Sequence, residues 1–94
     1  MRQYFVYIMS SINQTIYIGV TNNLVRRVFE HQQGAVKGFT KKYRCTRLIY
    51  YEIYSDVRLA ISREKQLKSW RRSKKNTLIE ELNPHWDELY PTLG

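Results

Sequence analysis

This 94-residue sequence is poor in cysteine, in long apolar runs and in acidic residues, and each shortage limits what the chain can be. The single cysteine, Cys45, excludes an internal disulfide and most cysteine-based metal sites. No apolar run approaches the roughly 20 residues that a membrane-spanning helix needs. The first residues, MRQYFVYIM, lack the cleavage pattern of a signal peptide, so we expect a cytoplasmic protein.

The shortage of acids sets the charge of the chain. Eight acidic residues against 16 lysines and arginines give a formal net charge of +8 and a pI near 9.8. Such a field attracts polyanions, so we expect a nucleic-acid partner, with neither DNA nor RNA excluded. A membrane surface is disfavoured, because no strongly amphipathic basic helix stands apart. With 43% apolar and 26% charged residues, residues 1–94 are expected to form one globular domain.

The N-terminal part of the chain has the pattern of a β-hairpin. Two aromatic and β-branched runs, Tyr4–Met9 and Thr15–Val20, flank the polar segment Ser10–Gln14. The segment around Gly19 is not a phosphate-binding P-loop, since it has one glycine and no lysine of that motif.

The register of this hairpin decides whether two tyrosines meet. If Met9 pairs with Thr15, Tyr7 lies opposite Tyr17 and both side chains project from one face. A shift of two residues keeps them on that face, whereas a shift of one separates them. By themselves the two tyrosines are also consistent with simple cross-strand packing.

The remaining chain predicts helices around one more strand. The expected elements are a helix over Asn23–Gln32, a basic loop over Gln33–Thr46, a strand over Arg47–Tyr54, a helix over Val57–Arg72 and a helix over Ser73–Leu82. We expect Leu78, Ile79 and Leu82 to be the buried side of the last helix, and Trp86, Leu89 and Tyr90 to pack back on the core.

Two polar side chains lie beside the apolar stripe of the first helix. Arg27 follows Leu24 by three positions, and His31 follows Val28 by three and Arg27 by four. Such spacing places Arg27 and His31 on the face that packs against the hairpin. For His31, a structural role is as compatible with the pattern as a catalytic one.

Glu64 interrupts the apolar stripe of the next helix. That stripe runs through Val57, Ala60, Ile61, Leu67 and then Trp70 or Arg71, with Glu64 at helical spacing among them. A carboxylate on an apolar face costs stability unless it is paired or binds a metal. The sequence leaves two alternatives: a salt bridge to an inward-reaching arginine such as Arg27, or metal binding.

Together these residues have the chemistry for phosphodiester hydrolysis. A lone carboxylate suits Mg²⁺, which keeps most of its waters and takes other ligands from substrate phosphate. Arg27 offers donors to the developing negative charge. A tyrosine can act as a general base only if nearby cations lower its pKa from about 10. We expect Tyr7 in this role, supported by Tyr17.

The same residues resemble the motifs of the GIY-YIG nuclease superfamily. Phe5-Val6-Tyr7 and Tyr17-Ile18-Gly19 match its two strand motifs, and Arg27, His31 and Glu64 follow in order. The resemblance covers nearly the whole chain and is closest to the small stand-alone, single-domain, UPF0213-like members. It implies an α/β (α+β) fold in which a three-stranded antiparallel sheet is flanked by helices, with a nuclease site that uses a divalent metal.

The resemblance also implies roles for individual residues. Tyr7 and Tyr17 match the motif tyrosines, Arg27 the helix arginine, Glu64 the metal ligand, and Gly19 the glycine that allows close approach to the tyrosines. The position of His31 is histidine in some branches and tyrosine in others. Phe5 stands in place of the first motif's glycine, and Val20 stands where excision-repair members carry lysine. Asn76 matches an asparagine of that branch.

The sequence therefore predicts an endonuclease dependent on Mg²⁺ or Mn²⁺ that cleaves DNA with little sequence specificity. The residues expected to hold the nucleic-acid backbone are Lys41, Lys42, Arg44, Arg63, Lys65, Lys68, Arg71 and Arg72. The alternatives are a non-catalytic nucleic-acid-binding domain that kept the nuclease fold, and a protein-interaction module with a basic face.

Overall fold

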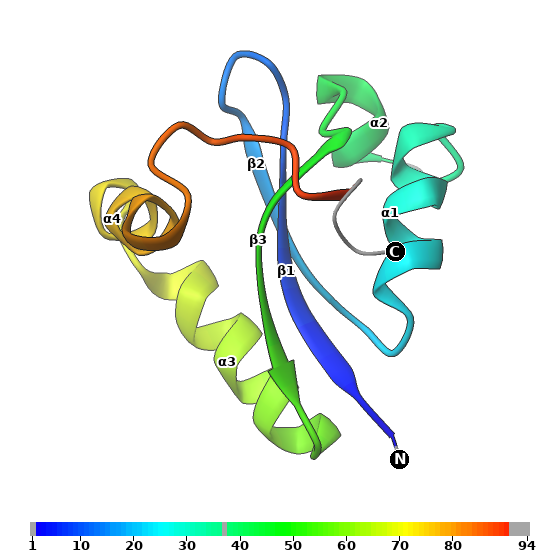
Figure 1. The fold of residues 1–94 in the computed structure, drawn as a ribbon, viewed down its shortest axis with the longest axis vertical. Helices are drawn as coiled ribbons and strands as arrows, with labels where there is room; N and C mark the ends of the chain where they lie inside the picture. The colour runs from blue at the N-terminus through cyan, green and yellow to red at the C-terminus, as the bar shows by residue number, and fades with distance from the viewer. Residues whose placement is uncertain (1, 37, 91–94) are drawn as a thin grey trace.

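The computed structural model describes residues 2–36 and 38–90, which form a three-stranded antiparallel sheet and four helices in an α+β fold (Figure 1). The predicted fold class is thereby confirmed. In chain order the elements are β1 (Tyr4–Ser10), β2 (Ile16–Thr21), α1 (Leu24–Gln32), α2 (Phe39–Tyr43), β3 (Arg47–Tyr54), α3 (Val57–Ser69) and α4 (Arg72–Leu82). The strand order is β2-β1-β3, so β1 lies in the middle of the sheet.

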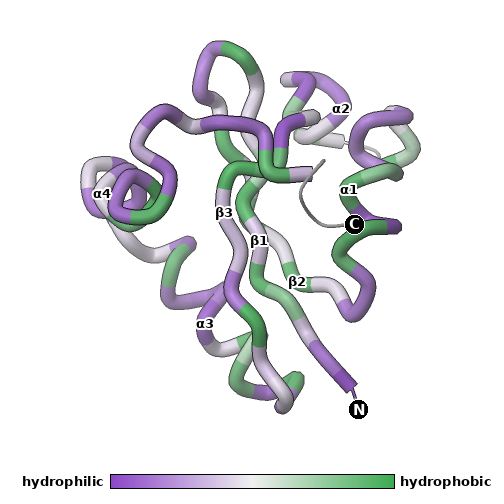
Figure 2. The backbone as a smooth tube through the Cα atoms, in the orientation of Figure 1, coloured by the Kyte–Doolittle hydropathy of each residue, from purple (hydrophilic) through white to green (hydrophobic). Residues whose placement is uncertain are grey.

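Helices cover both faces of the sheet. Figure 1 shows α1 and α2 on one side of the strands and α3 and α4 on the other. Side chains alternate along β1, so Val6 joins the cluster under α3 and α4, which includes Leu67. Tyr7 joins the cluster under α1, which includes Val28. Figure 2 shows β1 and β2 largely in the hydrophobic colour, while much of α4 is hydrophilic.

The hairpin register brings the two tyrosines together diagonally. Met9 pairs with Tyr17 and Tyr7 pairs with Gly19, so the predicted pairing of Met9 with Thr15 is wrong by two residues. A shift of two preserves the face, and the Tyr7 and Tyr17 ring centroids lie 6.2 Å apart.

Capping side chains begin two of the helices. The Asn23 side chain accepts a hydrogen bond from the Arg26 backbone N–H and caps α1. The Asp56 side chain accepts one from the Arg58 backbone N–H and caps α3.

Two predicted boundaries differ from the structure. The loop expected over Gln33–Thr46 contains the short helix α2. The helix expected over Val57–Arg72 ends at Ser69, because Trp70 and Arg71 adopt extended backbone conformations before α4 begins. This break lets α4 turn away from the direction of α3 (Figure 1).

Three side chains expected to be buried are exposed. Leu82 is 76% exposed, because Ile79 is the residue that α4 buries fully. Val57 and Ile61 are 38% and 40% exposed, since α3 rests on the sheet through Ala60 and Leu67. Glu64 follows Ala60 by four positions and precedes Leu67 by three, so it stays on the packed face.

The C-terminal segment passes across one end of the sheet. Trp86 is buried with the α3 and α4 cluster, whereas Leu89 and Tyr90 pack against the α1 cluster. The Asn83 side chain donates to the backbone oxygens of Ile49 and Asp87, which holds the crossing in place. Among the helices of the described ranges, none is long and apolar enough to cross a membrane.

Candidate active site

The Tyr7 hydroxyl is the centre of a buried hydrogen-bonded cluster. It lies 3.0 Å from Nε2 of His31, and a guanidinium nitrogen of Arg27 donates to it at 3.4 Å. Tyr7 is fully buried and His31 is 4% exposed. Strand β1 and helix α1 therefore bring together three of the predicted site residues, as the helical spacing of Arg27 and His31 indicates.

The hydrogen bonds of this cluster assign its protons. The Arg27 guanidinium can only donate, so the tautomer that satisfies the Tyr7 hydroxyl proton is the one in which Nε2 of His31 accepts it. His31 then carries its own proton on Nδ1. Burial, aided by the charge of Arg27, lowers the pKa of His31 to about 4, which keeps the ring neutral at physiological pH.

Burial also changes the expected acid–base behaviour of Tyr7. It raises the pKa of Tyr7 to about 12, although the hydrogen bond from Arg27 opposes the rise. The hydrogen bond and charge of Arg27 alone do not lower this pKa, because desolvation outweighs them. A Tyr7 anion does not form near neutral pH, so any proton that Tyr7 accepts must be matched by one that it gives to His31.

Gly19 allows the close packing of the tyrosines. A Cβ atom at this position would lie 2.6 Å from the Tyr7 hydroxyl oxygen and 2.9 Å from Cε2 of Tyr17. Both separations are too short for any larger side chain. The glycine of β2 is therefore required for the position of the Tyr7 ring.

Tyr17 is the more accessible of the two tyrosines. Its ring packs at 5.5 Å from the His31 ring and 6.2 Å from the Tyr7 ring, between centroids. Within the described residues its hydroxyl has no hydrogen-bond partner, and it is not among the buried unpartnered groups. The Tyr17 hydroxyl is therefore free to contact solvent or substrate.

Glu64 reaches this cluster through Lys68. The Lys68 ammonium lies 2.9 Å from the Glu64 carboxylate and 5.9 Å from the centroid of the Tyr17 ring. The Glu64 side chain is 19% exposed. Arg27 instead pairs with Glu30 at 3.3 Å, so the salt bridge between Arg27 and Glu64 that we considered is not formed. Lys68, four residues after Glu64, is a partner that helical spacing could have identified.

The donor chemistry at Glu64 fits one class of metal ion. No cluster of three or more histidine, cysteine, aspartate or glutamate side chains occurs in the described part of the chain. A single half-buried carboxylate suits a hard cation such as Mg²⁺ or Mn²⁺, whose other ligands are water and substrate oxygens. It does not suit Zn²⁺, which needs three or four protein ligands.

The predicted backbone-binding cations fall into two groups. Lys41, Lys42, Arg44, Lys65 and Arg71 are exposed. Arg63 is held by Glu52, with 3.0 Å between Nε and Oε1, and its guanidinium lies 5.1 Å from the Trp70 ring centroid. Arg72 donates to Asn76 and to the backbone oxygen of Gln14 in the hairpin loop. These two arginines therefore have internal partners.

Glu52 is a partly buried acid that the sequence analysis did not single out. Burial disfavours its ionisation, but hydrogen bonds from Arg63, Tyr50 and Tyr54 outweigh burial and lower its pKa. It lies on the face of the sheet opposite Tyr7, with all of these partners in place. The cluster is a structural one.

Comparison with known proteins agrees with this arrangement. Residues 3–77 match the family model described as the GIY-YIG catalytic domain. The chain belongs to the GIY-YIG family. Its members form a nuclease superfamily, and the matched range includes every residue of the tyrosine cluster and Glu64.

This GIY-YIG domain is similar in sequence to UPF0213 proteins. It is 32% identical to a UPF0213 protein of Bacillus pumilus over 84% of this chain and 81% of that protein. It is 35% identical to one of Haloquadratum walsbyi, over 83% and 88% of the two chains. The solution NMR structure of a UPF0213 protein from Bacillus halodurans superimposes with a TM-score of 0.60 over 92% of each chain, at 23% identity, and shows the same fold.

Proposed function

We propose that this GIY-YIG domain is an endonuclease that hydrolyses DNA phosphodiester bonds with little sequence specificity, and that it depends on Mg²⁺ or Mn²⁺. The observation that carries the proposal is the cluster in which Arg27 and His31 both contact the Tyr7 hydroxyl, with Glu64 linked to Tyr17 through Lys68. Simple packing of aromatic rings does not need a neutral histidine and an arginine on one buried hydroxyl.

The exposure of the two hydroxyl groups separates the roles of the tyrosines. Tyr17, with its free hydroxyl, contacts the attacking water. Tyr7 accepts the proton of this water while its own hydroxyl proton passes to Nε2 of His31. Neither tyrosine therefore needs to be ionised at rest. Tyr7 thus acts together with His31 as the base that we first expected of Tyr7 alone.

Hydrolysis then balances in one displacement. The water oxygen bonds to phosphorus, one ester oxygen leaves, and the proton of the water is held as the second proton of the His31 ring. Arg27, 35% exposed in its side chain, can hold the non-bridging phosphate oxygens while their charge increases. Solvent returns a proton to the leaving oxygen.

Glu64 is the residue that would hold the metal. When bound, Mg²⁺ or Mn²⁺ supplies Lewis-acid polarisation of the phosphoryl and leaving oxygens. To bind the metal, Glu64 must give up its ion pair with Lys68. The Lys68 ammonium is then free to contact phosphate.

The cations outside the cluster hold the nucleic-acid backbone. Lys41, Lys42, Arg44, Lys65, Lys68 and Arg71 are exposed and supply contacts that position the substrate without reading its sequence. Binding should weaken steeply with salt, because each phosphate contact releases counterions. Arg63 and Arg72, with their internal partners, contribute less than we expected from the sequence.

The deciding experiment is cleavage of linear and branched DNA with Mg²⁺ or Mn²⁺, comparing the wild type with Glu64→Gln. The exposed acid variant Glu81→Gln is the matched control. We expect Glu64→Gln to lose at least 100-fold in rate while Glu81→Gln cleaves normally. Salt-sensitive binding without any cleavage by the wild type would instead identify a non-catalytic nucleic-acid-binding domain.

A further inference from the structure

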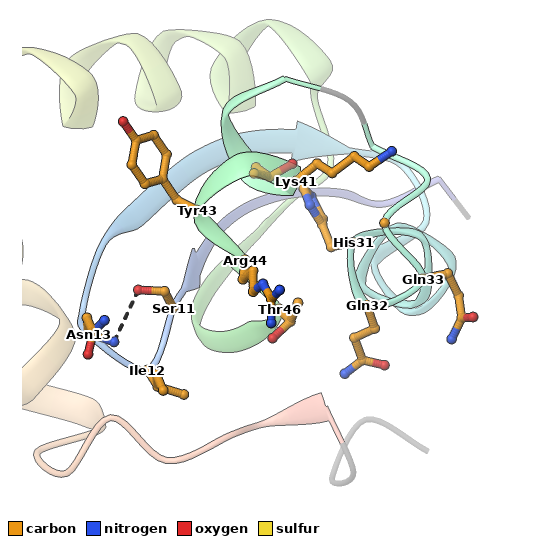
Figure 3. A pocket seen from close by; sticks show the side chains of 12 residues that line it. Ser11, Ile12, Asn13, His31, Gln32, Gln33, Lys41, Tyr43, Arg44 and Thr46 are labelled. Atoms are coloured by element: carbon orange, nitrogen blue, oxygen red, sulfur yellow. Dashed lines mark hydrogen bonds between the residues drawn. The ribbon is translucent and has the colours of Figure 1, made fainter.

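A cavity lies behind the histidine of the tyrosine cluster. It has a volume of about 590 Å³ and lies between the β1–β2 loop, the C-terminal end of α1 and helix α2. Figure 3 shows side chains from these segments arranged around it. The residues important here are His31, Gln32, Gln33, Lys41, Arg44 and Thr46.

His31 lines this cavity and carries an unpaired ring nitrogen. Its Nε2 faces the Tyr7 hydroxyl, and the two nitrogens of an imidazole ring point in widely different directions. Nδ1 is the one buried side-chain nitrogen or oxygen without a hydrogen-bond partner in the described part of the chain. It carries the ring proton, and a buried N–H without an acceptor is costly. A ligand oxygen would remove that cost.

The charge of the lining residues indicates which kind of ligand would accept a hydrogen bond from His31. Lys41 and Arg44 both line the cavity, and no acidic side chain is among its described lining residues. The side-chain amides of Gln32 and Gln33 and the hydroxyl of Thr46 add neutral donors. Two cations, neutral donors and a buried imidazole N–H together suit a phosphate group.

We propose that this cavity binds a phosphate group of nucleic acid, held by the Nδ1 proton of His31 and by Lys41 and Arg44. The inference rests on the proposed function, and it adds a second phosphate site to the one where cleavage occurs. His31 connects the two, since it lines the cavity and its Nε2 lies 3.0 Å from the Tyr7 hydroxyl.

An anion in the cavity has a consequence for the Tyr7 hydroxyl. Negative charge beside Nδ1 favours the doubly protonated ring, and therefore favours proton transfer from Tyr7 to Nε2. The charged and titratable groups around His31 are Tyr7, Tyr17, Arg27, Glu30, Lys41 and Arg44. Occupation of the cavity thus prepares His31 to accept the proton.

The test is an NMR titration that follows the ring nitrogens of the two histidines. The probes are a thymidine dinucleotide with a 5′-phosphate, the same dinucleotide without it, and inorganic phosphate. We expect either dinucleotide to move the Nδ1 resonance of His31 and to raise the pKa of that ring. The resonances of His85, exposed outside the cavity, should stay in place.

Charge variants provide a second measurement. Lys41→Gln and Arg44→Asn should each weaken dinucleotide binding about tenfold, the effect of one charged hydrogen bond. Lys74→Gln removes the same charge from α4 and should leave the affinity unchanged. An unchanged His31 resonance with both dinucleotides, or a shift with inorganic phosphate alone, overturns the proposal.

The outcomes also separate this site from the proposed function. Dinucleotide binding at His31 in a protein that never cleaves DNA supports the cavity and rejects the nuclease proposal. Glu64-dependent cleavage without any change at His31 supports the nuclease and rejects the cavity as a phosphate site.

Discussion

The hydroxyl of Tyr7 lies 3.0 Å from Nε2 of His31, and both residues are buried. Tyr7 comes from the middle strand and His31 from the last turn of α1, 24 residues later. Removing either partner leaves the other buried without its hydrogen bond, which costs about 1–3 kcal/mol. Both stability and chemistry should therefore depend on this pair.

The two tyrosine hydroxyls should have different effects on stability. Tyr7→Phe leaves Nε2 of His31 unpaired and should lower the free energy of unfolding by about 1–3 kcal/mol. Tyr17→Phe removes a hydroxyl without a hydrogen-bond partner in the described residues, so its stability should change by less than about 0.5 kcal/mol. Both should reduce the cleavage rate at least about 100-fold. Urea unfolding and single-turnover cleavage measure the two effects, and equal stability losses would contradict the assigned contacts.

The buried His31 should make stability depend on pH in a defined range. Its pKa is lowered from 6.5 in the unfolded chain to about 4 in the folded one. Between these values the unfolded state binds more protons, so His31 adds stability as pH rises from about 4 to 6.5 and loses it on acidification. The total contribution is about 3 kcal/mol at most.

This contribution can be isolated by difference. The unfolding free energy of the wild type minus that of His31→Gln should rise between pH 4 and 6.5. A flat difference curve for His31→Gln would mean that the ring is not held neutral.

Gly19→Ala should disturb the tyrosine cluster directly. The new methyl group would meet the Tyr7 ring carbon Cζ at 2.7 Å and its oxygen at 2.6 Å, so the ring must shift. We expect a loss of about 1–3 kcal/mol in unfolding free energy, typical of overpacking. In the Tyr7→Phe background the loss should be smaller by about 0.5–1 kcal/mol, because one of the close contacts is gone. Strictly additive losses in thermal or urea unfolding would show that the oxygen is not in contact with this position.

Lys68→Gln should strengthen metal binding at Glu64. The ion pair between them is partly exposed on the lysine side, and such pairs are worth about 0.3–1 kcal/mol. Its removal should tighten Mn²⁺ binding about two- to fivefold, as measured by the relaxation of water protons. Lys65→Gln, a cation of the same helix without this partner, serves as the control. Unchanged Mn²⁺ affinity in Lys68→Gln would place the metal elsewhere.

Arg63 and Lys65 should separate stability from nucleic-acid binding. Arg63→Gln leaves Glu52 without its ion pair and should cost about 2 kcal/mol of stability near neutral pH. The pKa of Glu52 is lowered in the folded state, so the stabilising effect of Arg63 should disappear as pH falls through that lowered value. Lys65→Gln should leave stability intact and reduce the salt dependence of DNA binding by about one counterion. Fluorescence anisotropy at several salt concentrations and urea unfolding distinguish the two roles.

The local patterns of the sequence determined the elements and the faces on which the site residues lie. Alternation along two short runs predicted the hairpin, and helical spacing placed Arg27 and His31 toward it and Glu64 on the packed face of α3. These features follow from the geometry of one strand or one helix. They hold whatever the rest of the chain does.

Tertiary structure alone decided how these side chains are paired and charged. The register moved by two residues, the cation beside Glu64 is Lys68 and not Arg27, and burial raised the pKa of Tyr7 where nearby cations were expected to lower it. Each outcome depends on distances between separate elements and on how much water the packing removes, and spacing along the chain contains neither quantity. The local sequence sets the face on which each residue lies, whereas the assembled core sets its partner and its protonation.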